Sequence, residues 1–72
     1  MIEVRLAIPN AYNAGEWRIS RQVIGPRGGK SWKKVISQPA TGGEYRTSLE
    51  AGTYKETYWT NGWPTSRTFE VL

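Results

Sequence analysis

The sequence predicts an all-β protein: one domain, residues 1–72, folded as a small two-layer antiparallel β-sandwich of about six to seven strands. Several segments alternate apolar and polar residues, which is the period of a half-buried strand. Turn-forming Gly, Pro and Asn recur at roughly the 8- to 12-residue spacing of sandwiches and small barrels. No window keeps apolar residues at helical spacing without a Gly or Pro, so we expect no helix longer than one turn.

The first strand is the clearest. Residues 2–8 place Ile2, Val4, Leu6 and Ile8 on one face and charged side chains on the other. Residues 9–15 follow as a loop, because Pro, Asn and Gly supply turn dihedrals and interrupt ladder hydrogen bonding. The N-terminal alternation lacks the continuous apolar stretch of a secretory signal, so no signal peptide is expected.

A second strand has Trp17, Ile19 and Val23 on one side and polar side chains on the other. Residues 25–30 then form the strongest breaker cluster of the chain, Gly-Pro-Arg-Gly-Gly-Lys. Residues 32–37 resume an extended pattern. This arrangement predicts a long hairpin or a crossover around the cluster.

Three more strands are expected at residues 44–49, 53–60 and 66–72, separated by Ala51-Gly52 and by residues 61–64. In the second of these, Glu56 shares a face with apolar rings, so it should be paired, lie at an edge, or belong to a strand with both faces partly covered. The side chains expected inside the sandwich are those of Ile2, Val4, Leu6, Trp17, Ile19, Leu49, Tyr54, Phe69 and Val71.

The C-terminal half resembles the carboxypeptidase regulatory-like domains, which are Ig-like β-sandwiches of the prealbumin-like or transthyretin-like type. The resemblance rests on Leu49-x-x-Gly52-x-Tyr54, on a Gly-aromatic pair eight residues beyond Tyr54, Gly62-Trp63, and on a final alternating strand. It implies a non-catalytic accessory or adhesion module. It also implies that Gly62 turns the chain so that Trp63 folds back over the sandwich edge.

The composition argues against an enzyme and against a cofactor or metal site. The chain has no Cys and no His, and its six acidic residues are scattered Glu residues, so we expect no disulfide, no metal ligand set and no activated nucleophile. The segment ending in Gly29-Lys30-Ser31 looks like a phosphate-binding loop, but Ile24 occupies the position where that motif requires Gly.

A basic segment is the main candidate for binding. Residues 18–34 hold six cations and no acid, and Trp17 and Trp32 bracket them, in a chain of net charge +4. A glycine-rich basic segment with flanking rings is typical of single-stranded nucleic-acid binders, in which cations follow phosphates and rings stack on bases. Met1-Ile2-Glu3-Val4 and the Gly29-Lys30-Ser31-Trp32 loop are similar to small filamentous-phage single-strand binding proteins. The alternatives are a solvated loop or an arm that lies on an acidic protein surface.

A second candidate is aromatic. Trp59 and Trp63 are either lids over the core or, with Tyr58, an exposed patch of the kind enriched at interfaces. A sugar-binding platform is a weaker alternative, because the chain has no Asp and few Asn near these rings.

The favoured function is a non-catalytic binding or structural module, a small virion protein that decorates or cements a capsid or tail assembly. The alternative is a single-stranded DNA- or RNA-binding protein of phage or plasmid type that uses the basic segment 18–34. We expect a virion or cytoplasmic location, no membrane span, a large protein assembly or nucleic acid as partner, and homo-oligomers as a further source of stability for so small a core. The candidate partner-binding residues are Arg18, Arg21, Arg27, Lys30, Trp32, Lys33, Lys34, Tyr58, Trp59 and Trp63.

Overall fold

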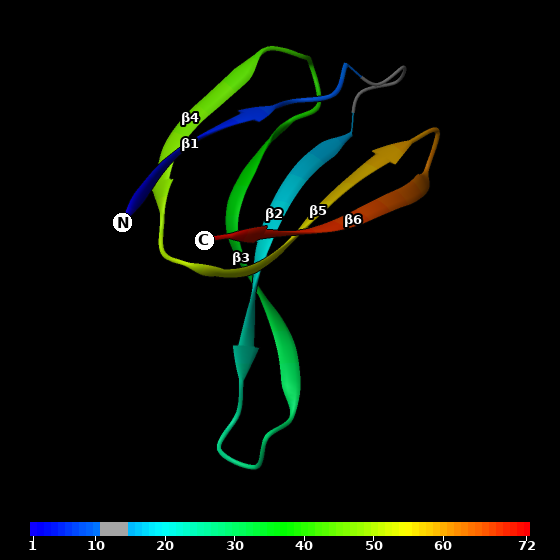
Figure 1. Ribbon diagram of the computed structural model, residues 1–72. Coiled ribbons are helices and arrows are strands. Elements are labelled where there is room, and N and C mark those ends of the chain that lie inside the picture. The colour runs from blue at the N-terminus through cyan, green and yellow to red at the C-terminus, as the bar shows by residue number, and fades with distance from the viewer. Residues whose placement is uncertain (11–14) are drawn as a thin grey trace.

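The computed structural model describes residues 1–10 and 15–72, which form six strands and no helix (Figure 1). The strands are β1 (Ile2–Ala7), β2 (Glu16–Ile24), β3 (Lys30–Pro39), β4 (Glu44–Leu49), β5 (Gly52–Thr60) and β6 (Trp63–Val71). β1 and β4 pair in a two-stranded sheet, and the other four form a sheet in the order β3-β2-β5-β6. All pairings are antiparallel. The predicted all-β sandwich is confirmed; residues 11–14 of the predicted first loop lie outside the described residues.

The core lies between the two sheets and centres on Trp17, Ile19 and Tyr54, which are fully buried. Leu49 and Val71 are also buried, as predicted. The remaining predicted side chains that pack against this core are half-buried: Val4, Leu6 and Phe69.

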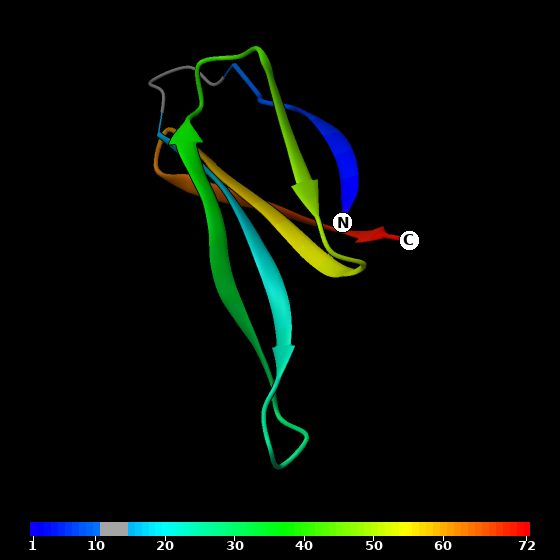
Figure 2. The ribbon, with the colours of Figure 1, turned by 90° about the vertical axis from the view of Figure 1, so that its left-hand side faces the viewer.

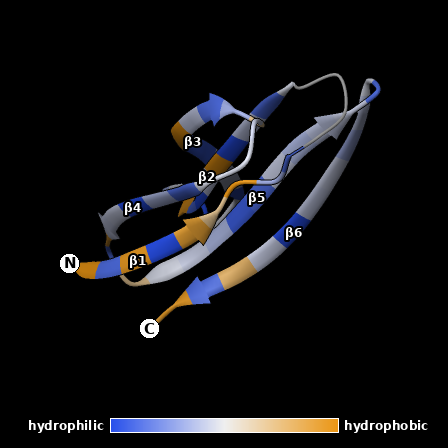
Figure 3. Cartoon of the chain, turned by 90° about the horizontal axis from the view of Figure 1, so that it is seen from above, coloured by the Kyte–Doolittle hydropathy of each residue, from blue (hydrophilic) through white to orange (hydrophobic). Residues whose placement is uncertain are grey.

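Ile2 is the exception, because it remains 38% exposed where β1 begins at the margin of the two-stranded sheet. Ile36 and Ala40, which alternation did not single out, complete the core. Figure 3 shows hydrophobic and hydrophilic residues alternating along β1, the pattern from which this strand was predicted.

β6 starts earlier than predicted. A two-residue turn joins it to β5, with φ of 52° at Asn61 and 82° at Gly62, so Trp63 and Pro64 already belong to the strand. Positive φ at both central residues is the geometry of a type I′ hairpin, for which Asn-Gly is the preferred pair. Pro64 is tolerated because β6 is an edge strand. Trp63 is 77% exposed, so the expected fold of its ring over the sandwich edge is wrong.

The β2–β3 hairpin extends beyond the body of the protein (Figures 1 and 2). β5 pairs with β2 only as far as Arg21, whereas β2 and β3 remain paired up to Ile24 and Lys30. At the tip, the Gly25 N–H donates to the Gly29 carbonyl at 2.7 Å, and Gly28 has a φ of 81°. The radius of gyration of 12.8 Å exceeds the roughly 11 Å expected of a compact chain of this length, as a projecting ribbon requires. We call residues 21–34 the basic ribbon.

Candidate functional site

A β-bulge decides which way the side chains of the basic ribbon point. Ile19 pairs with Ile36, but the next residue, Ser20, pairs with Lys34, so Val35 is an extra residue in β3. Ile19 and Ile36 are buried and face the β1–β4 sheet. Residues directly opposite in an antiparallel pair share a face, and neighbours along a strand alternate. Lys34 therefore points to the opposite, solvent side of the four-stranded sheet, which we call the outer face.

The same bulge brings Trp32 to the outer face. Trp32 pairs with Gln22, two residues beyond Ser20, and its ring lies 4.7 Å from the Lys55 ammonium. Lys55 comes from β5, where it pairs with Ser20. Without the bulge, simple alternation would have put Trp32 on the same side as the buried Ile36, which shows how bulges re-aim side chains.

A second pair of a cation and a ring lies further along the outer face. The Arg18 guanidinium carbon is 5.1 Å from the centroid of the Trp59 ring. Arg18 pairs with Thr57, so Arg18 and Trp59 come from adjacent strands on the same side. Contacts of this kind stabilise by about 0.5–1 kcal/mol at exposed sites and fix the ring beside a positive charge.

The centre of the outer face is covered by its own long side chains. Ser20 and Thr57 point to solvent by alternation, yet they are only 5% and 9% exposed. The Thr57 hydroxyl contacts that of Ser66 at 3.2 Å. Long cationic and aromatic side chains lie flat over apolar and hydroxyl surface in this way while their charged ends stay in water.

The electrostatics of the outer face are positive. Among the described residues, Lys30, Lys34 and Lys55 form no ion pair. The Glu16 carboxylate lies 2.6 Å from Arg18 Nε, and this hydrogen bond holds the pKa of Glu16 below its usual value. Glu16 is therefore ionised and already bound by a cation of the same face, and Glu70, which pairs with Thr53, is the other acid that the register places on this face.

The inner side of the basic ribbon is different. Arg21 forms a 2.6 Å ion pair with Glu50, and the Tyr54 hydroxyl donates to the Glu50 carbonyl at 2.7 Å. Lys33 pairs with Arg21 across the ribbon and shares this side. The six cations predicted as one cluster are therefore divided: Arg21 and Lys33 lie on the inner side, Arg18, Lys30 and Lys34 on the outer side, and Arg27 at the turn.

The predicted aromatic group is also divided. Trp59 is on the outer face, whereas Tyr58 pairs with the buried Trp17 and belongs to the inner side. Trp63 pairs with Thr60 and lies on the inner side as well, at the far end of the β5–β6 hairpin. Lys55 was missed because it is an isolated cation in the C-terminal half. The alternation of β5 could have identified Lys55, because it places Lys55 on the same face of the strand as Trp59 and on the other face from Tyr54.

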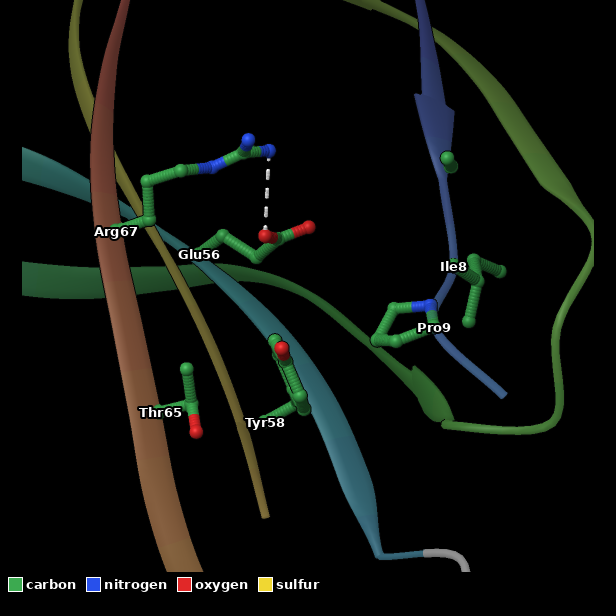
Figure 4. Close-up of a pocket in the computed structure, with 7 residues that line it drawn as sticks. Ile8, Pro9, Glu56, Tyr58, Thr65 and Arg67 are labelled. Atoms are coloured by element: carbon green, nitrogen blue, oxygen red, sulfur yellow. Dashed lines mark ion pairs between the residues drawn. The ribbon is translucent and has the colours of Figure 1, made fainter. Parts of the chain in front are cut away.

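A cavity of about 310 Å³ lies between the sheets beside a buried carboxylate (Figure 4). Glu56 is 8% exposed; it accepts a 2.9 Å hydrogen bond from the Trp17 indole N–H and lies 3.4 Å from Arg67. Ile8 and Pro9 form the wall on the β1 side. Both carboxylate oxygens have a partner, so of the three predicted alternatives for Glu56 the structure shows the paired one, and Glu56 has a structural role between the layers.

In the part of the chain that the structure describes, no three acidic, His or Cys side chains lie close enough together to hold a metal ion. Nor do these residues include a helix of the length and hydropathy needed to span a membrane. No family model, no curated protein and no solved structure matches this chain. The likeness to carboxypeptidase regulatory-like domains therefore stays a prediction.

Proposed function

We propose that this protein binds single-stranded nucleic acid through the basic ribbon, without catalysis. The observation that supports this most strongly is the composition of a two-stranded ribbon that leaves the body of the protein. It bears Arg27, Lys30, Lys33 and Lys34, all without ion pairs among the described residues, together with the ring of Trp32. Cations that follow phosphates and rings that stack on bases are the two contacts that binding of single strands requires.

Folding does not explain this composition. Residues 24–34 of the basic ribbon are all exposed, so they add nothing to the core between the sheets. Isolated two-stranded hairpins are marginally stable in water. A long exposed ribbon with an excess of one charge costs stability through self-repulsion, which favours a role in binding an anionic partner.

Attachment to a capsid or tail assembly, the function favoured by the sequence alone, would use the same ribbon on an acidic protein surface. Its support is the exposed Ile24 and Val35, which would be covered on a protein partner. The pairing of rings with cations favours nucleic acid instead. Trp32 and Trp59 each lie beside a cation, and a stacked base with its phosphate would engage both groups at once. Virion attachment stays a prediction that the same experiment addresses.

The test is a fluorescence anisotropy titration of labelled oligo-dT and oligo-rU at about 50 mM salt, where phosphate contacts are strong. We expect micromolar or tighter binding to either strand, since phosphates and base faces are common to DNA and RNA. Replacing Arg27, Lys30, Lys33 and Lys34 together by Ala should abolish it. Replacing Arg5 and Arg46 by Ala on the other sheet is the control; it removes two cations where the ribbon variant removes four, and it should bind as the unmodified protein does. No binding by the unmodified protein would overturn the proposal and leave the virion module in its place.

A further inference from the structure

We infer that the bound strand lies on the outer face, running from Trp32 on the ribbon to Trp59 on β5, with Lys34, Lys55 and Arg18 contacting its phosphates. This inference rests on the proposed function and makes it specific. It adds Lys55 to the site and excludes the inner side of the basic ribbon as the path of the strand.

The length of this path suits a short single strand. Trp32 lies level with Gln22 of β2, and Trp59, which follows the partner of Trp17, lies level with Glu16. Six residues of a strand at about 3.3 Å each separate the two rings by about 20 Å along β2. Several nucleotides span that distance, which falls in the roughly 4- to 16-nucleotide range of compact single-strand sites.

The outer face is not covered by the second sheet, whereas the inner side is covered at the base of the ribbon. At the base of the ribbon the inner side meets Met1, Tyr45 and Leu49, which line a cavity against the β1–β4 sheet. A strand on that side would run into the sandwich interior and into the Glu50 carboxylate. Among residues 1–10 and 15–72, no strand packs on the outer face of β2 or β5, as Figure 2 shows.

The charges favour the same face. Arg21, on the inner side, is already bound by Glu50 at 2.6 Å, and on the outer face Arg18 is bound by Glu16 at the same distance. On the outer face Lys30, Lys34 and Lys55 form no ion pair among the described residues, so a phosphate would meet them without displacing a carboxylate. Each cation beside a ring can contact a phosphate while the base of the same nucleotide stacks on that ring.

Lys33 and Lys34 provide a matched pair for the test, because they are adjacent, carry the same charge and point to opposite faces. The affinity for oligo-dT is measured from about 50 to 200 mM salt for Lys33→Ala, Lys34→Ala and Lys55→Ala. We expect Lys34→Ala and Lys55→Ala each to reduce the slope of log affinity against log salt by about 0.7, which is about eightfold in affinity at 50 mM. Lys33→Ala should leave the slope unchanged.

The half-buried ring of Trp59 and the exposed ring of Trp63 give an independent comparison. Trp59→Ala should weaken binding roughly 5- to 150-fold through lost stacking, whereas Trp63→Ala, on the inner side, should not. Equal losses for Lys33→Ala and Lys34→Ala, or unchanged binding by both Lys55→Ala and Trp59→Ala, would overturn the assignment to the outer face while the proposed function stands. The lysine pair is at the surface and remains informative even if Trp59→Ala fails to fold. If the unmodified protein does not bind at all, both proposals fall.

Discussion

The sandwich has two solvent-facing surfaces, and they differ in their balance of charges and in their aromatic side chains. On the β1–β4 sheet, alternation exposes Glu3, Arg5, Glu44 and Arg46, a balanced set in which Arg46 contacts Glu44 at 2.8 Å. The outer face of the four-stranded sheet instead has two indole rings and lysines without ion pairs. A mixed, balanced surface is sufficient for solubility. The excess of cations and rings on the other side therefore requires a different explanation, and binding of an anionic partner provides it.

The largest expected effect comes from reversing charge on one face at a time. Replacing Lys30, Lys34 and Lys55 by Glu should lower affinity for oligo-dT by at least about 500-fold at 50 mM salt, because three phosphate contacts are lost. Replacing Arg5 and Arg46 by Glu lowers the net charge by four units on the β1–β4 sheet, against six units for the triple variant. If this second variant loses as much affinity, binding depends on net charge alone and the two surfaces are equivalent.

A substitution in the core between the two sheets should change the stability of the protein and not its affinity for the strand. Trp17→Phe removes the indole donor to Glu56 and leaves one buried carboxylate oxygen without its partner. We expect a loss of about 1–3 kcal/mol in the free energy of unfolding, measured by urea denaturation. Below the unfolding transition, affinity for oligo-dT should not change. A variant as stable as the unmodified protein would show that the hydrogen bond to Glu56 is dispensable.

The smallest effect concerns Glu16, the acid bound to Arg18 on the outer face. Glu16→Gln frees Arg18 for a phosphate, so binding should tighten by at most about eightfold at 50 mM salt. The pKa of Glu16 is lowered in the folded protein, so the stability it provides is present above its ordinary value of 4.5 and is lost as pH falls through the lowered value. Any advantage in melting temperature of the unmodified protein over Glu16→Gln should therefore be present at neutral pH and should decrease as the pH falls below 4.5. Weaker binding by Glu16→Gln would contradict a phosphate contact at Arg18.

Alternation predicted most of the fold, because each sheet buries one face and the period of two marks it. It failed where one residue changes the register. Trp32, Lys34 and Ile36 lie at every second position, so alternation alone places all three on the same face of the sheet. Val35 forms a bulge, and Ile36 therefore lies on the opposite face from the other two. Pro64 led to the prediction of a loop, because proline is excluded from central strands. The sequence does not show that β6 is an edge strand, where proline is tolerated.

The candidate site was predicted in part for a similar reason. The cations of residues 18–34 are contiguous in the sequence, but a sheet distributes neighbours to opposite faces. Lys33 and Lys34 therefore separate, and Lys55 joins from a strand more than twenty positions away. Sites that several strands build across a sheet depend on pairing register, which a single sequence does not specify.

The four indole N–H groups allow the most direct test, because each tryptophan samples a different part of the molecule. Trp17 is buried against Glu56, Trp63 is exposed on the inner side, and Trp32 and Trp59 lie on the outer face. In ¹H–¹⁵N correlation spectra of the labelled protein titrated with oligo-dT, we expect the signals of Trp32 and Trp59 to shift and those of Trp17 and Trp63 not to shift. A shift of Trp63 with Trp32 and Trp59 unmoved, or no shift at saturating oligonucleotide, would contradict this expectation.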